Sequence, residues 1–193
     1  SKLLIEDSFG CVDSGLLTCT PNIDRLAKQG VQFSNFSCSA AQCGPTRHEL
    51  YTGLLPPSSG VYSNGYKPRG DYRNIANYLG ELGYKVGITG KTHFDVSDFQ
   101  KISGFESNGN HGAPTWEMSG VRRFIETSGS EKKPFCVVLA SVNAHHPWTV
   151  GDPSHFPSDK IIVPPHMVDT PLTRQALAIH AAEVEVLDEQ VGA

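Results

Sequence analysis

The sequence predicts an α/β protein in which a mostly parallel sheet is flanked by helices. Short apolar segments with strand character alternate with segments that have the apolar period of a helix, an order typical of this class. One run, residues 134–142, is continuously apolar, as in strands that are covered on both faces in a parallel sheet. Polar side chains follow three predicted strands at their carboxyl ends, where such sheets bind ligands.

The first elements are defined by the residues at their ends. Residues 3–5 form a short apolar run that predicts a strand. Residues 20–30 predict a helix that Thr20 caps and Gly30 ends. Partial alternation of apolar and polar residues over 31–36 predicts a second strand.

Apolar periods and turn residues define the remaining elements. Cys43 begins a short helical pattern that Gly53 weakens or ends. In chain order, the sequence then predicts a helix over 75–82, a strand over 84–89, a loop over 97–115, a helix over 116–127, the strand over 134–142 and a long helix over 170–190.

The composition limits the kinds of partner. The 193 residues carry a formal charge of −4, and no block of Lys or Arg suggests a nucleic-acid surface. No apolar run approaches the roughly 20 residues that span a bilayer, so we expect no membrane span. The five cysteines show no zinc-like spacing. An anionic substrate would therefore need a local basic pocket.

Cys43 combines three features that favour a reactive group. It lies at or next to the N-terminus of a predicted helix, because Pro45 is favoured at the first helical position. Unpaired backbone N–H groups and the helix dipole favour negative charge there. Arg47 follows four residues on, which places it on the same helix face. The motif alone is equally compatible with a buried structural cysteine, since free cysteines are among the most buried residues.

Two neighbouring acids, Glu6 and Asp7, follow the first predicted strand. Carboxylate oxygens in this position suit a hard divalent cation such as calcium or magnesium. Asp13 is a reserve ligand. Taken alone, these acids are more simply interpreted as solvated charges at the start of a loop.

Basic residues follow two other predicted strands. Lys91 and His93 lie on one segment and, if it is extended, point to the same side, where they can neutralise an anion and move a proton. His145 and His146 follow the apolar strand, and on an extended chain only one of them faces a given side. Each group alone is an ordinary surface charge. Their common position at strand ends indicates one shared site.

These motifs resemble the signature of the type I sulfatases. Residues 43–53 match the pattern Cys-x-Pro-Ser-Arg followed by Leu-x-x-Gly, with Thr46 in place of the serine. Residues 90–93 are similar to the family's Gly-Lys-x-His segment, and residues 145–147 to its His-x-Pro segment. Further similar segments at 20–27 and 79–84 extend the resemblance over nearly the whole chain. Residues 147–153 and 168–171 also resemble the narrower heparan N-sulfatase-like branch.

The resemblance implies an alkaline-phosphatase/sulfatase-like fold and hydrolysis of sulfuric esters, or sulfamates, on a sulfated small molecule or glycan. In this family the cysteine, here Cys43, becomes formylglycine through a formylglycine-generating enzyme or an anaerobic sulfatase-maturating enzyme. The hydrated aldehyde is the nucleophile and a ligand of a divalent metal, usually calcium, with magnesium the alternative. Glu6 and Asp7 stand where the family has a metal-binding Asp-Asp pair, and Glu6 departs from that pattern.

The resemblance also implies a role for each basic residue. Arg47 and Lys91 hold the nucleophile and offset charge in the transition state. His145 and Lys91 orient the sulfate, and one basic residue protonates the leaving group. His93 is the base that regenerates the aldehyde.

In the family, further metal ligands and another lysine come from a strand beyond residue 193. We therefore expect residues 1–193 to be the N-terminal part of a single sulfatase catalytic domain, incomplete without its C-terminal part. The family suggests a periplasmic, secreted or lysosomal location. Two alternatives stay open: a phosphonate or phosphodiester hydrolase of the same superfamily, and an inactive truncated relative that binds anionic glycans.

Overall fold

The computed structural model describes residues 20–33, 35–104 and 116–193, which form two compact units. The sheet unit contains the described residues 35–104 and 117–141. The helical unit contains residues 20–33, 116 and 142–193. The strand predicted over 3–5 lies outside the described residues.

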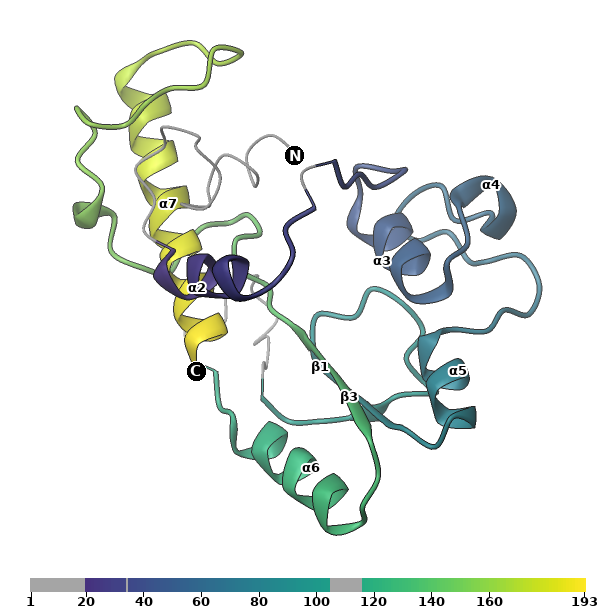
Figure 1. Cartoon of the computed structure of the whole chain (residues 1–193). Coiled ribbons are helices and arrows are strands. Elements are labelled where there is room, and N and C mark those ends of the chain that lie inside the picture. The colour runs from purple at the N-terminus through teal and green to yellow at the C-terminus, as the bar shows by residue number, and fades with distance from the viewer. Residues whose placement is uncertain (1–19, 34, 105–115) are drawn as a thin grey trace. The chain divides into compact units, whose positions relative to one another are not determined.

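Three parallel strands form the sheet, in the order β2-β1-β3. They are β1 (Lys85–Gly90), β2 (Gln100–Lys101) and β3 (Phe135–Ala140), and β1 and β3 pair from end to end (Figure 1). The strands predicted over 84–89 and 134–142 are thus confirmed, with the second shorter at both ends. The parallel sheet and its flanking helices confirm the predicted α/β class.

The sheet unit also contains four helices, which are α3 (Cys43–Thr52), α4 (Pro56–Ser59), α5 (Ile75–Glu81) and α6 (Ser119–Ser130). The prediction of a helix over 75–82 is confirmed as α5, which begins with a reciprocal cap between Asn74 and Asn77. The helix predicted over 116–127 is α6, shifted by three residues. Side chains of α3, α5 and β1 share one core, in which Ile88 is 2% exposed. This core fixes α3 against the sheet.

Three details of the sequence prediction are wrong. Described residues between 31 and 36 form no strand, and Val31 and Phe33 are largely exposed, because alternation alone supplies no neighbouring strand to pair with. The strand β2 lies inside the predicted loop over 97–115, since a two-residue strand is too short to show a period. The apolar strand β3 is not covered on both faces in the described structure, because Phe135 and Leu139 are about 40% exposed.

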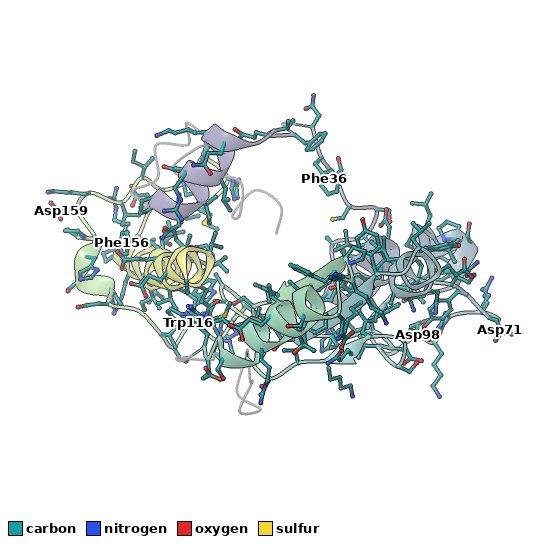
Figure 2. The ribbon with its side chains drawn as sticks, turned by 60° about the horizontal axis from the view of Figure 1, so that its bottom comes forward. Phe36, Asp71, Asp98, Trp116, Phe156 and Asp159 are labelled. Carbon is teal, nitrogen blue, oxygen red and sulfur yellow. The ribbon has the colours of Figure 1, made fainter. Side chains whose placement is uncertain are left out.

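The helical unit contains α2 (Pro21–Gln29), the short 3₁₀ turn η1 (Pro153–His155) and the long helix α7 (Pro171–Gly192). The helices predicted over 20–30 and 170–190 are confirmed as α2 and α7, which pack together (Figure 1). Phe156 lies beside α7 in a second apolar cluster (Figure 2). No helix in the described ranges has an apolar stretch long enough to cross a membrane.

The first turn of α2 is capped from α7, not by its own flanking threonine. Thr20 occupies the cap position, but its hydroxyl donates to Asp24 and makes no bond to the backbone of the helix. The carboxylate of Asp188 accepts instead from the backbone N–H groups of Asn22 and Ile23, at 3.1 and 2.8 Å. A side chain 166 residues away therefore does what the sequence assigned to Thr20.

Candidate active site around Cys43

Cys43 is the first residue of α3, so the prediction of a cysteine at a helix N-terminus is confirmed. Pro45 is the third helical residue and not the first, which corrects the predicted start of the helix. The helix accommodates it because the first four N–H groups of a helix have no acceptor within that helix. Gly53 ends α3 as predicted, with a φ of 73° and its N–H bonded to the carbonyl of Glu49.

His93 contacts Cys43 directly. Its Nδ1 lies 3.1 Å from the Cys43 Sγ, although 50 residues separate the two in the sequence. The predicted extended segment is not observed, since His93 has a φ of +46° in the left-handed region. This turn in the chain directly after β1 brings the imidazole to the end of α3.

Arg47 and Lys91 join α3 to the carboxyl end of β1. The Arg47 Nη1 donates to the Lys91 carbonyl oxygen at 2.9 Å. The Lys91 N–H donates in turn to the carbonyl of Ala140, the last residue of β3, at 2.8 Å. The arginine that lies one turn beyond Cys43 is thus held by the backbone of the strand end, and it keeps its charge beside the cysteine.

Lys91 is buried, with 9% of its surface exposed. Burial lowers the pKa of its ammonium group, and the positive charge of Arg47 acts in the same direction. The Cys43 thiolate charge has the opposite effect on the Lys91 pKa. An anion bound near Cys43 would likewise favour the charged lysine, which couples Lys91 protonation to what occupies the site.

Asn64 is a contact of Cys43 that the sequence reasoning missed. Its Oδ1 accepts from the Gly44 N–H at 2.8 Å and lies 3.4 Å from the Cys43 Sγ. A Cβ on Gly44 would stand only 2.8 Å from this oxygen, so the glycine after the cysteine permits the approach. The pair Asn64-Gly65 signals a turn in the sequence, but only the tertiary fold shows where that turn docks.

The structure brings Cys43, Arg47, Lys91 and His93 together in the sheet unit. The predicted metal ligands Glu6 and Asp7, with the reserve candidate Asp13, lie outside the described residues. Among the described residues, no group of three His, Cys, Asp or Glu side chains is placed to hold a metal ion.

His145 belongs to the helical unit and is described with it. It is exposed, follows β3 by five residues, and its Nδ1 lies against the carbonyl oxygen of His146. The His146 ring instead meets Trp148 edge-on, at 5.7 Å between ring centres. The two neighbouring histidines therefore make different contacts, as expected for adjacent residues.

The segment after these histidines is held by α7. The Glu183 carboxylate accepts from the backbone N–H groups of Thr149 and Val150, at 3.2 and 3.0 Å. Gly151 follows with a φ of 83°, where a Cβ would stand 2.4 Å from a carbonyl oxygen of α7. Close contact with α7 thus requires glycine at this position.

Comparison with known proteins identifies the family. Residues 3–160 match the family model described as Sulfatase. The chain belongs to the sulfatase family. The ulvan-active sulfatase of Formosa agariphila is 30% identical to this sulfatase chain over 140 residues, which cover 71% of the chain and 27% of that protein.

Solved structures support the fold of this sulfatase chain. One, described with the metabolism of multiple glycosaminoglycans by Bacteroides thetaiotaomicron, has a TM-score of 0.72 at 18% identity, covering 97% of this chain and 54% of that one. The phosphonate monoester hydrolase of Agrobacterium radiobacter has a TM-score of 0.71 at 18% identity, covering 97% and 55%. Such low identity speaks for the fold alone. The chain spans between 20% and 28% of the length of the first curated relatives it matches.

Proposed function

We propose that the protein is a hydrolase of sulfuric esters or sulfamates on sulfated carbohydrate, with formylglycine formed at Cys43. The observation that carries the proposal is the placement of Cys43 at the start of α3, in contact with His93 and beside the Arg47–Lys91 pair, in a chain of the sulfatase family. A relative named as acting on ulvan supports carbohydrate as the substrate class. In this proposal, residues 1–193 form the N-terminal part of a single sulfatase catalytic domain.

Two groups would complete the chemistry of the site. Formylglycine at position 43 would supply a hydrated aldehyde as the attacking oxygen nucleophile, with a divalent cation such as calcium, or magnesium, to polarise it. The described surroundings of Cys43 are basic apart from the Asn64 carbonyl oxygen, so the carboxylate ligands of a hard cation would come from Glu6 and Asp7.

The described residues supply the charges and the proton transfers. His93, 3.1 Å from the Cys43 Sγ, is placed to take a proton from an oxygen at that position. Arg47 and Lys91 offset negative charge that develops on the sulfuryl group. We assign His145, with Lys91, to orientation of the sulfate, and one of these basic groups to protonation of the leaving oxygen or nitrogen.

The first test separates the sulfatase proposal from its alternatives. Whole protein made together with a maturating enzyme is assayed on an aryl sulfate and on an aryl phosphonate ester, and we expect faster turnover of the sulfate. Faster phosphonate turnover would replace the proposal with a phosphonate or phosphodiester hydrolase. Mass spectrometry of the Cys43 peptide should find the aldehyde, whereas an intact thiol would favour an inactive relative that binds anionic glycans.

The second test concerns the cysteine itself. Cys43→Ala should abolish turnover, since the nucleophile is derived from this side chain. Cys136→Ala is the matched control, because Cys136 is a half-buried free cysteine on β3. Activity of the control should stay close to that of the parent, because we expect the change to act on stability and not on the nucleophile. Equal losses in both variants would assign Cys43 a structural role.

A further inference from the structure

A cavity of about 720 Å³ opens beside Cys43 within the sheet unit. Three of its walls belong to the cysteine site: Gly44 follows the cysteine, and Asn64 and His93 contact its sulfur. The cavity therefore lies next to any group that reacts at position 43. The volume is in the range of pockets that enclose a small ligand, typically about 300–1,000 Å³.

The walls of the cavity combine aromatic faces with few charges. Tyr66, Tyr72 and Phe94 line it, and such rings pack against the apolar C–H face of a flat or puckered ring. Lys67 is the one lysine or arginine among the described residues that line it, and Asp95 is the one acid. This charge content suits a ligand with hydroxyl groups and no more than one further anionic group.

His48 provides a second, independent sign of a ligand. It lies in the cavity wall, is 3% exposed, and packs edge-on against Tyr72 at 4.7 Å between ring centres. Its Nε2 is buried without a hydrogen-bond partner among the described residues. A buried polar atom left in this way marks a place where a ligand or ordered water completes the hydrogen bonding. Burial also lowers the pKa of His48, which favours the neutral imidazole over the charged one.

We propose that this cavity binds the sugar ring that carries the reacting sulfate, with Tyr66 packing on the ring, His48 completing a hydrogen bond and Lys67 pairing with a second anionic group. This inference rests on the proposed function, because it treats the sugar as the leaving group of the reaction at Cys43. It adds a substrate class, a sulfated monosaccharide unit with one further acidic substituent, and it names the residues that select it.

Binding can be measured without turnover in whole protein carrying Cys43→Ala. The probes for titration calorimetry are inorganic sulfate, galactose 6-sulfate, glucosamine 6-sulfate and glucosamine 2-N,6-O-disulfate. We expect at least one sugar ring to bind more tightly than inorganic sulfate, and the disulfate to bind more tightly than the matching monosulfate. Turnover of 4-nitrophenyl sulfate by protein with Cys43 intact is measured separately and tests the proposed function.

Three substitutions test the residues. Tyr66→Ala should weaken sugar binding about three- to tenfold and leave inorganic sulfate unchanged, while Tyr62→Ala, an exposed tyrosine of the same loop outside the cavity wall, should change neither. Lys67→Ala should remove the advantage of the disulfate, about two- to fivefold, and Lys101→Ala should preserve it.

The third substitution, His48→Phe, separates ligand binding from folding. It keeps an aromatic ring and removes the unpartnered nitrogen, so the melting temperature should rise or stay level while sugar binding weakens about two- to tenfold. If His48 had only a structural role, its replacement would not weaken sugar binding while the melting temperature stayed level or rose. If sugars bind no better than inorganic sulfate, or Tyr66→Ala equals Tyr62→Ala, the subsite is wrong even when 4-nitrophenyl sulfate is hydrolysed. Sugar binding without any such hydrolysis would overturn the proposed function and leave a binding site.

Discussion

The contact between His93 and Cys43 depends on a backbone conformation that residues other than glycine rarely adopt. With a φ of +46°, His93 turns the chain just after β1 and places its Nδ1 3.1 Å from the sulfur. Left-handed conformations are uncommon outside glycine and are tolerated best by Asn, Asp and His. Histidine therefore satisfies both the local backbone and the chemistry of a base, and few other residues would do both.

His93→Asn should separate these two properties. Asparagine tolerates the left-handed backbone but has no imidazole, so we expect a stable protein whose kcat on an aryl sulfate falls about 10²- to 10⁴-fold, the usual contribution of a general base. KM should change much less. His155→Asn is the control, since His155 is exposed and pairs with Glu185 in the helical unit. Steady-state kinetics with a similar loss in both variants would refute the assignment of His93.

Glu183 gives a prediction for the dependence of stability on pH. Burial raises the pKa of its carboxyl group, and the N–H groups of Val150 and Thr149 only partly oppose this effect. Between the ordinary carboxyl pKa of 4.5 and the raised pKa of folded Glu183, this side chain is ionised in the unfolded chain but still protonated in the folded one. The folded state therefore loses stability as the pH rises through this range. Glu183→Gln removes this titration and keeps an oxygen acceptor.

The melting temperature of the Glu183→Gln variant relative to the parent should therefore increase across that pH window and level off above it. Glu189→Gln is the control, since Glu189 is the exposed glutamate near the end of the same helix. Thermal unfolding between pH 4 and pH 8 makes the comparison. A difference that is constant with pH would show that the pKa of Glu183 is the same in the folded and the unfolded protein, and would contradict a raised pKa.

At the scale of elements, α2 and α7 depend on each other through one carboxylate. Asp188 accepts from the Asn22 and Ile23 N–H groups and from the Asn22 side-chain amide, so the end of α7 supplies the cap of α2. Negative charge at a helix N-terminus also interacts favourably with the helix dipole. The two helices should therefore unfold as one unit.

Asp188→Ala should destabilise this pair by about 1–3 kcal/mol, since it removes a cap and leaves partly buried N–H groups unpaired. The loss should appear in urea unfolding as a lower midpoint. Glu189→Ala, one residue further on and exposed, should change the free energy of unfolding by less than about 0.5 kcal/mol. Two variants of equal stability would mean that Thr20 or water replaces the cap without cost.

Elements were predictable from the sequence where local signals suffice. The helices α5 and α7 have caps next to them in the sequence, α2 begins with a proline, and β1 and β3 have apolar runs long enough to recognise. Residues 31–36 show the opposite case, because their alternation reflects no pairing partner in the described structure. The α2 cap could not be predicted, since the identity of its acceptor depends on contacts between distant segments.

For the molecule as a whole, the sequence predicted which residues gather at Cys43 better than how they do so. The order of strands placed Lys91 and His93 at the carboxyl end of β1, where the fold has them. Asn64 and His48 could not be recognised from the sequence, because only the folded structure shows what a turn or a helix face contacts. The hydrogen bond from Arg47 to the Lys91 carbonyl oxygen could not be predicted either, because every residue type has a backbone carbonyl.

The proposed cation gives a prediction for the whole protein. Treatment with a chelator should abolish sulfate ester hydrolysis and lower the melting temperature, since a ligand that binds only the folded state stabilises it. Calcium should restore both, and magnesium serves as the comparison. Glu6→Ala with Asp7→Ala should make the protein insensitive to the chelator. Unchanged activity and stability after chelation would remove the cation from the proposal.

Arg47 is held by a carbonyl oxygen and not by a carboxylate, and the distinction matters for how anions reach the site. A carbonyl fixes the guanidinium in place and leaves its full unit of charge unneutralised, whereas an acid would have cancelled it. Among the described residues, no carboxylate forms an ion pair with Arg47. Although the chain has a formal net charge of −4, the described residues thus present a local positive field beside Cys43. At physiological salt, screening limits that field to about 8 Å. Added salt would therefore weaken the attraction of anions to the site, while the hydrogen bond from Arg47 to the Lys91 carbonyl stays intact.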